Sequence, residues 1–308
     1  MATSIANHAL EAYLTDTRAR VDAVLERWSV IAQAFWAAPV PAAVEYSVLS
    51  AGKRLRPTLV FAAYEALGGD DAASGIAELA AAVEVVHAYS LVHDDLPCMD
   101  NDDLRRGRPT VHRAFDVRAA TSAGFHMVGL AARVLASGLD ALGVEPERRR
   151  AIALELFRAA GAGGMIGGQV LDLEAEGLVI SIEALREVHQ RKTGALIAAA
   201  CAIGGLAAGS NAPADHLAAL RAYGEAIGLA FQIADDILDA TATSAQLGKT
   251  AGRDAALAKS TFVSVLGVGA ARAEAERLAA QAVDRLRQAA LVSPTLVALA
   301  HYIVTRTN

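Results

Sequence analysis

Apolar residues recur along this chain at the spacing of an α-helix. Near the N-terminus the pattern runs through Leu10, Leu14, Val21, Val24 and Leu25. Intervals of three, four and seven residues place side chains on one helix face. Sustained alternation of apolar and polar residues, which is typical of half-buried strands, is scarce. The pattern therefore predicts an all-α fold.

Proline and glycine clusters divide this pattern into roughly ten or more helices. We predict breaks at 39–41, 68–70, 97, 107–109, 161–168, 209–211 and 241–252. The segment 291–308 is expected to form a further helix that ends in an exposed basic residue, Arg306. No linker rich in Pro, Gly or Ser interrupts the 308 residues, so we predict one domain covering 1–308.

Composition narrows the function classes. Hydrophobic residues make up 54% of the chain and aromatic residues only 5%, which suits closely packed helices rich in Ala and Leu. The net charge of -6 provides no basic field for nucleic acid. The apolar stretch 193–208 is too short to span a bilayer, and the N-terminus does not resemble a signal peptide. Cys98 and Cys201 are expected to be small buried residues. We therefore predict a cytoplasmic protein without a membrane span.

A first acidic cluster, Asp94, Asp95 and Asp100, follows the apolar run 79–92. Pro97 lacks a backbone N–H and clashes with a preceding carbonyl, so the helix should end or kink there. That bend would bring Asp100 back towards Asp94. Taken alone, such a cluster is more often a solvated helix end than a site.

A second cluster consists of Asp235, Asp236 and Asp239. Asp235 and Asp239 lie four residues apart, on one helix face, where like charges repel unless a cation lies between them. Donors that are all oxygen favour magnesium over zinc. The apolar neighbours of the cluster predict a helix with a buried face, so a metal site is the favoured interpretation here.

Basic residues lie beside both clusters, a combination that implies a diphosphate ligand. Arginine offers a planar fork to phosphate oxygens and lysine a mobile point charge. The candidates are Lys53, Arg56, Arg105, Arg106, Lys192, Lys249 and Lys259. For Arg54 and Arg108 we prefer ordinary surface charge. His87 lies two helical turns before Asp94 and on the same side, although a lone histidine among apolar neighbours is more often a core residue.

Five segments resemble bacterial farnesyl and geranylgeranyl diphosphate synthases of the polyprenyl synthetase family: His87–Pro97, Arg105–Gly107, Gly167–Gln169, Lys192–Leu196 and Phe231–Asp239. The resemblance implies a helical bundle around a deep central cavity, usually homodimeric. It also implies three magnesium ions that bridge the acidic motifs to an allylic diphosphate. The implied reaction condenses isopentenyl diphosphate with dimethylallyl or geranyl diphosphate by ionisation, condensation and proton elimination. The implied product is farnesyl diphosphate, with geranylgeranyl diphosphate as the alternative.

The resemblance also implies residue roles. The metal ligands would be Asp94, Asp95, Asp100, Asp235 and Asp239, and Asp236 joins the catalytic candidates. Isopentenyl diphosphate would be held by Lys53, Arg56, His87 and Arg106. The allylic diphosphate would be held by Arg105, Lys192, Gln232, Lys249 and Lys259. Thr193 and Gln169 would lie near the developing carbocation, and Tyr89 would form the floor of the elongation cavity.

One position departs from the family pattern. Where the family usually has Phe-Gly-Glu followed by Gly-Asp, this chain has Phe115-Asp116-Val117 followed by Gly124-Phe125-His126. A usual carboxylate is therefore replaced by Phe125. Two alternatives stay open at this point: a class I terpene cyclase, which ionises and folds a single prenyl diphosphate, and a weakly active regulatory paralogue of a prenyl synthase.

Overall fold

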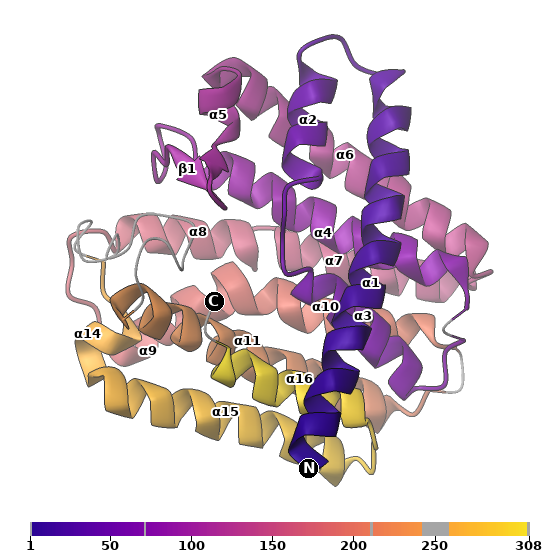
Figure 1. Cartoon of the computed structure of the whole chain (residues 1–308), viewed down its shortest axis with the longest axis vertical. Coiled ribbons are helices and arrows are strands. Elements are labelled where there is room, and N and C mark those ends of the chain that lie inside the picture. The colour runs from indigo at the N-terminus through magenta and orange to yellow at the C-terminus, as the bar shows by residue number, and fades with distance from the viewer. Residues whose placement is uncertain (1, 71, 210–211, 242–258, 307–308) are drawn as a thin grey trace.

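The computed structural model describes residues 2–70, 72–209, 212–241 and 259–306. Helices make up nearly all of this part of the chain (Figure 1), which confirms the all-α prediction. The helices are α1 Ala2–Gln33, α2 Val40–Val48, α3 Leu55–Ala66, α4 Ser74–Asp94, α5 Val111–Ala114, α6 Val117–Ala141, α7 Pro146–Ala160, α8 Met165–Glu174, α9 Ile182–His189, the π-helical turn η1 Gln190–Gly194, α10 Ala195–Ala207, α11 Ala214–Thr241, α14 Phe262–Leu266, α15 Val268–Gln288 and α16 Pro294–Thr305.

Local side chains begin several of these helices. Asp116 caps α6 by accepting a hydrogen bond from the backbone N–H of Ala119 at 2.6 Å. Ser181 and Ser293 cap α9 and α16 in the same way. Each cap satisfies a backbone donor that the first helical turn leaves without a partner. Asp116, which lies where the family usually has Phe-Gly-Glu, is therefore the N-cap of α6.

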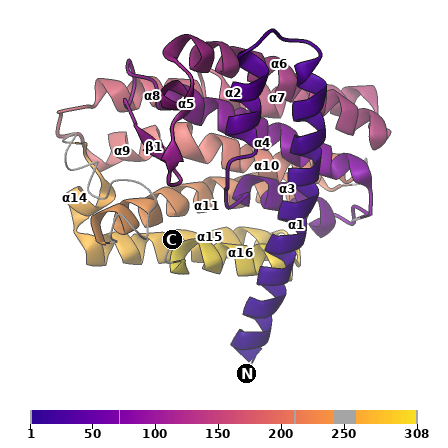
Figure 2. The ribbon, with the colours of Figure 1, turned by 45° about the horizontal axis from the view of Figure 1, so that its top comes forward.

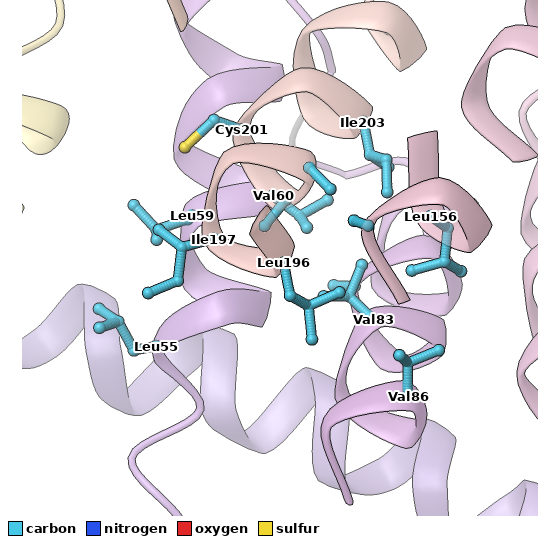
Figure 3. Close-up of a cluster of buried hydrophobic side chains, with 14 of the residues drawn as sticks. Leu55, Leu59, Val60, Val83, Val86, Leu156, Leu196, Ile197, Cys201 and Ile203 are labelled. Carbon is cyan, nitrogen blue, oxygen red and sulfur yellow. The ribbon is translucent and has the colours of Figure 1, made fainter. Parts of the chain in front are cut away.

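The core is built around α10, which packs against α3, α4 and α7. Figure 3 shows Leu196 of α10 among Val60 of α3, Val83 of α4 and Leu156 of α7. A Cβ added at Gly204 would lie 2.2 Å from the carbonyl oxygen of Val60, so glycine lets α10 and α3 approach closely. The apolar stretch 193–208 is thus a buried core helix.

One cluster of buried apolar residues extends from Leu10 in α1 to Ile303 in α16. A core of this extent agrees with one domain over residues 1–308, which stays a prediction. Among the described helices, α4 is the one long and apolar enough to cross a membrane, but 78% of its most apolar window is buried inside the protein. Figure 2 shows α4 surrounded by other helices, as expected of a core helix.

The helix α4 ends where Pro97 predicts. Its last residue is Asp94, and the chain then turns so that the backbone N–H of Asp100 donates to the carbonyl of Asp94 at 2.8 Å. The predicted return of Asp100 towards Asp94 is confirmed. This geometry places both acidic residues at one end of a rigid core helix.

The loop after this turn forms a small antiparallel hairpin. Strand β1 (Leu104–Arg105) pairs with β2 (Arg108–Pro109) through a two-residue turn. Arg106 and Gly107 both have positive φ, 55° and 74°, as a tight hairpin turn of this twist requires. The hairpin was not expected from the sequence, and it carries Arg105 and Arg106.

The predicted breaks at 39–41, 68–70, 97 and 107–109 fall at helix ends or between helices, and 161–168 does so as far as Gly164. Of the break at 209–211, Gly209 follows the end of α10 and residues 210–211 lie outside the described part. The break at 241–252 follows the end of α11, and its residues from 242 lie outside the described part. Breaks at 49–54, 142–145, 175–181 and 289–293 were missed. Each of these loops contains a single glycine or directly precedes a proline, without the clusters that marked the predicted breaks.

Three predictions about single residues were wrong. Cys98 is exposed in the loop after α4, whereas Cys201 is buried as predicted. Arg54 is buried because its guanidinium donates to Glu84 at 2.8 Å in the interior. Arg306 is also buried, at the end of α16. Each of these two arginines is buried because it pairs with a carboxylate that is distant in the sequence.

Candidate active site

The first acidic cluster brings several charges together at the end of α4. Burial raises the pKa of Asp94 to about 6, and the neighbouring carboxylates of Asp100 and Asp95 act in the same direction. The cations of Lys192 and Arg105 oppose this shift. A carboxylate that is hard to ionise, beside other carboxylates, is a position where a bound cation would be strongly stabilised.

Asp95 holds Arg105. The Nε of Arg105 donates to both carboxylate oxygens of Asp95, at 2.8 and 2.9 Å, and its Nη2 donates to Oδ1 at 2.6 Å. Burial disfavours the guanidinium charge, but the hydrogen bonds and charge of Asp95 outweigh it and raise the pKa of Arg105. Asp95 is therefore engaged by Arg105 in this structure, its role as a metal ligand stays a prediction, and Arg105 is held charged beside Asp94.

A lysine pair lies next to the first cluster. Lys192 Nζ lies 2.6 Å from Asp172 Oδ2, and Lys259 Nζ lies 3.2 Å from the same oxygen. Lys259 also contacts Asp100 at 3.2 Å and Glu176 at 3.3 Å. The structure thus brings Lys192 and Lys259, predicted to bind the allylic diphosphate, to the carboxylates of the first cluster.

Asp172 was missed in the sequence. It lies on α8 three residues after Gln169, one helical turn away, and this spacing was a usable signal. Burial opposes its charge, but Lys192 and Lys259 lower its pKa. Gln169 is buried, and neither its amide oxygen nor its nitrogen has a hydrogen-bond partner among the described residues. A Cβ added at Gly168 would lie 2.1 Å from the backbone nitrogen of Lys192, so glycine allows α8 to approach η1.

Within the second cluster, Asp236 differs from its neighbours. Its Oδ1 accepts from Gln232 Nε2 at 3.1 Å and its Oδ2 accepts from the backbone N–H of Phe262 at 2.9 Å. Thr193 donates to Gln232 Oε1 at 3.0 Å. This buried chain ties η1 and α14 to α11. Asp236, expected among the catalytic residues, therefore has a positioning arrangement. The contact of Thr193 with Gln232 was not predicted, and the expected roles of both residues stay predictions.

Asp235 is the more open carboxylate of the second cluster, with 41% of its side chain exposed. Arg306 Nη2 donates to its Oδ1 at 2.5 Å. Asp239, one turn further along α11, is buried. The π-helical turn η1 connects the two clusters, because Lys192 interacts with Asp94 and the adjacent Thr193 contacts α11.

The donor set fits magnesium. The described carboxylates do not form a closed cage, since no group of three His, Cys, Asp or Glu residues in this part of the chain is arranged to hold a metal ion. Instead Lys259 and Arg306 hold Asp100 and Asp235. Magnesium typically takes one or two protein carboxylates and completes its shell with water and substrate phosphates. Asp94, Asp100, Asp235 and Asp239 meet that requirement.

A second group of cations lies near Asp235. Burial lowers the pKa of Arg56 to about 10, although Glu84 and Asp235 favour its charge. Burial also lowers the pKa of Lys53, and Arg306 adds to the effect. Arg56 Nε has no hydrogen-bond partner among the described residues. Burial disfavours the positive charges of these side chains, so a bound anion would stabilise them.

Arg54 fixes the loop that carries Lys53. Besides Glu84, its guanidinium donates to Asp22 at 2.9 Å and to the backbone carbonyls of Val48 and Ser50 at 2.9 and 3.2 Å. This buried arginine is therefore structural. Arg108 is exposed, as predicted, and its guanidinium lies 4.2 Å from the ring centroid of Tyr46.

His87 and Arg106 line a small cavity of about 40 Å³ between α4 and the hairpin. Burial and the cations of Arg56 and Arg106 hold the pKa of His87 well below its ordinary value, so its imidazole is neutral near pH 7. Arg106 Nη1 donates to Ser50 at 2.9 Å. A neutral histidine among arginines can donate a hydrogen bond without adding charge.

Tyr89 and Phe125 both contact the ring of His93. The rings of Tyr89 and His93 meet edge to face with centroids 5.6 Å apart, and those of His93 and Phe125 at 5.5 Å. Tyr89 is buried, whereas Phe125 is 69% exposed on α6. The departure from the family pattern therefore lies at the surface, in contact with the first motif. Lys249 lies outside the described residues.

Residues 38–295 match the model of the family described as polyprenyl synthetase. Farnesyl diphosphate synthase of Escherichia coli (strain K12) is 45% identical over 271 residues, which cover 87% of this chain and 89% of that protein. An apo crystal structure of an FPP/GFPP synthase from Zymomonas mobilis superposes with a TM-score of 0.81 at 33% identity, covering 98% of this chain and 100% of that one.

A geranyltransferase from Helicobacter pylori, whose structure contains magnesium and isoprenyl diphosphate, has a TM-score of 0.78 at 30% identity over 94% of this chain and 96% of its own. These similarities extend over nearly the whole chain and include both acidic clusters, which lie within the matched residues. The chain belongs to the polyprenyl synthetase family.

Proposed function

We propose that this protein joins isopentenyl diphosphate head to tail to an allylic diphosphate and forms farnesyl diphosphate. The observation that carries the proposal is the presence of two separate cation groups beside the two acidic clusters. Lys192 and Lys259 lie at the first cluster. Lys53 and Arg56 interact with Asp235 of the second. Two diphosphate subsites of this kind suit a reaction between two diphosphate substrates.

Magnesium would be held by Asp94, Asp100, Asp235 and Asp239 together with the allylic diphosphate. When bound, it neutralises charge on the leaving diphosphate. The magnesium complex of the Helicobacter pylori relative supports the choice of metal. The number of ions, three, rests on the resemblance of the two acidic motifs.

The chain's own residues then have distinct tasks. Lys192, Lys259 and Arg105 stabilise the departing diphosphate, which leaves with the electron pair of the allylic C–O bond. Gln169 and Thr193 present polar atoms near the resulting carbocation, in a site that excludes water. Lys53, Arg56, Arg106 and His87 hold isopentenyl diphosphate so that its double bond supplies the electrons of the new C–C bond. A proton then passes from the adjacent carbon to the departed diphosphate, which leaves a longer prenyl diphosphate and diphosphate.

The chain's relatives favour this function over the alternatives considered from the sequence. They are named as farnesyl, geranylgeranyl and FPP/GFPP synthases, which condense two substrates, whereas a terpene cyclase ionises one. The retention of both acidic clusters argues against a regulatory paralogue. The farnesyl product is supported by the buried position of Tyr89, one to two turns before Asp94 on α4.

The proposal is tested by incubating purified protein with magnesium chloride, isopentenyl diphosphate and one of three primers: dimethylallyl, geranyl or farnesyl diphosphate. Product chromatography should show farnesyl diphosphate from the first two primers. Hydrocarbon formed from geranyl diphosphate without isopentenyl diphosphate would instead indicate a cyclase. The absence of any product with every primer would contradict the proposal.

A homodimer also belongs to this proposal. An exposed apolar patch on α6 and the α1–α2 loop includes Phe125 and Phe35, which are 69% and 55% exposed. The two residues line one shallow surface depression. Exposed patches of large apolar residues mark protein contacts, so a second copy is a suitable partner for this surface. Sedimentation equilibrium should give twice the mass of one chain, and Phe125→Asp with Phe35→Ser should shift the equilibrium towards monomer.

A further inference from the structure

The arginine that follows α16 contacts the second acidic cluster. Arg306 Nη2 lies 2.5 Å from Asp235 Oδ1 and donates to the carbonyl of Phe231 at 3.3 Å. Its guanidinium carbon lies 3.9 Å from the ring centroid of Phe231. Figures 1 and 2 show α16 beside α11, the helix that carries both partners. The end of the described chain is thereby fastened to the carboxylate that we propose as a metal ligand.

Packing alone does not account for this arginine. Its side chain is 1% exposed, and its Nε and Nη1 have no hydrogen-bond partner among the described residues. Buried donors without partners are costly, and an apolar side chain would cover Phe231 without that cost. The ion pair with Asp235 is therefore the interaction that a guanidinium supplies here and an apolar group does not.

The two partners of this ion pair differ in their exposure to solvent. The aspartate side chain is 41% exposed while the arginine is covered, so solvent reaches the carboxylate from the side away from Arg306. Lys53 and Arg56 also interact electrostatically with both Asp235 and Arg306. The negative charge of Asp235 is thus compensated by protein cations. A divalent cation approaching from solvent meets a carboxylate that is already paired.

Lys259 at the first cluster provides a useful comparison. It contacts Asp100, Asp172 and Glu176, so it keeps two carboxylate partners if Asp100 binds a metal. Arg306 pairs with Asp235 alone among the described carboxylates. Losing this one partner would leave a buried guanidinium uncompensated, a state that is strongly unfavourable. Displacement from Asp235 would therefore move the arginine out of its buried position.

We propose that Arg306 is a resident counter-cation of Asp235 that magnesium displaces, so that metal binding releases the end of α16 from α11. The inference rests on the proposed function in one respect, the binding of magnesium at Asp235. Because the same carboxylate cannot fully satisfy both cations, the arginine lowers magnesium affinity and magnesium lowers the occupancy of the ion pair by the same factor.

The first test titrates magnesium chloride into the metal-free, full-length protein by calorimetry, without substrates. Arg306→Gln should bind magnesium at least about fivefold more tightly than wild type, the low end of ordinary coupling between two sites. Arg306→Lys retains the charge and should stay close to wild type. Arg285→Gln is a matched control, because it removes one positive charge from an exposed residue of α15 and should leave the affinity unchanged. Equal affinity in Arg306→Gln and wild type would overturn the proposal.

The second test measures release directly. Carboxypeptidase Y, which needs no metal, is added to wild type with EDTA or with magnesium chloride at equal ionic strength, and mass spectrometry follows the removal of Arg306. Magnesium should accelerate this step in wild type but not in Asp235→Asn. If magnesium leaves the trimming rate unchanged, the release mechanism is wrong.

The two tests separate this inference from the proposed function. If Asp235→Asn binds magnesium as wild type does, the metal role of Asp235 fails. If Asp235→Asn loses magnesium affinity while Arg306→Gln and wild type behave alike in both tests, only the counter-cation inference fails.

Discussion

Replacing Asp94 by asparagine should stabilise the metal-free protein while removing most of its turnover. Asp94 is the last residue of α4, where the partial negative charge of the helix end disfavours an anion. Burial raises its pKa to about 6, helped by Asp100 and Asp95. At neutral and alkaline pH, Asp94 therefore carries a negative charge that burial and the neighbouring carboxylates destabilise. Asparagine has nearly the same shape and no charge.

The magnitude follows from the shift. The pKa rises from 3.8 to about 6, and each unit corresponds to about 1.4 kcal/mol, so the charged form costs up to about 3 kcal/mol of stability. Because the folded state holds the proton more tightly than the unfolded state, this cost is complete above about pH 6. It shrinks as the pH falls and vanishes below about pH 4. The advantage of Asp94→Asn should follow the same curve.

The assay is urea unfolding followed by circular dichroism in EDTA, at several values from about pH 8 down to about pH 4. Asp103→Asn is the control, because this exposed carboxylate pairs with the exposed Arg113 of α5 and should change stability by no more than about 0.5 kcal/mol. A variant no more stable than wild type at high pH, or an advantage independent of pH, would refute the reasoning. Turnover near wild type would refute the metal assignment of Asp94.

Three further changes test the site. Tyr89→Ala should open apolar volume below the first motif and lengthen the products towards geranylgeranyl diphosphate; chromatography showing an unchanged distribution from a folded, active variant would reject the floor assignment. Lys53→Ala should raise the KM for isopentenyl diphosphate about tenfold or more, as expected for loss of a charged hydrogen bond worth about 1.5–3 kcal/mol, and a selective rise for the allylic primer would contradict the division into two subsites. Phe125→Asp should raise turnover if the missing carboxylate limits catalysis, because the new group would face His93, and an unchanged or lower steady-state rate would favour a compensated surface substitution.

The outcomes for individual residues show which features local sequence encodes. The end of α4 and the return of Asp100 were predictable, because Pro97 acts on its immediate neighbours. The approach of α8 to η1 requires glycine at Gly168, but the sequence indicated only a break over 161–168 and not this contact. The two acidic clusters could be identified because their carboxylates lie within a few residues of one another.

Other features depended on contacts between distant segments. Arg306 and Asp235 are 71 residues apart, and Arg54 and Glu84 are 30 apart, so no local pattern indicated that either arginine is buried. Asp172 has an identifiable position one turn after Gln169, but its lysine partners are 20 and 87 residues away.

The sequence by itself therefore determined the helices, their main breaks and the residue types of the site, because helix periodicity, proline and glycine act over a few residues. The tertiary structure decided which charges meet. It directed Asp95 to Arg105 and Asp236 to Gln232 and the backbone of Phe262, although both carboxylates lie inside the acidic motifs. The free energy of a buried charge depends on partners brought together by packing, and packing joins segments that the sequence keeps far apart.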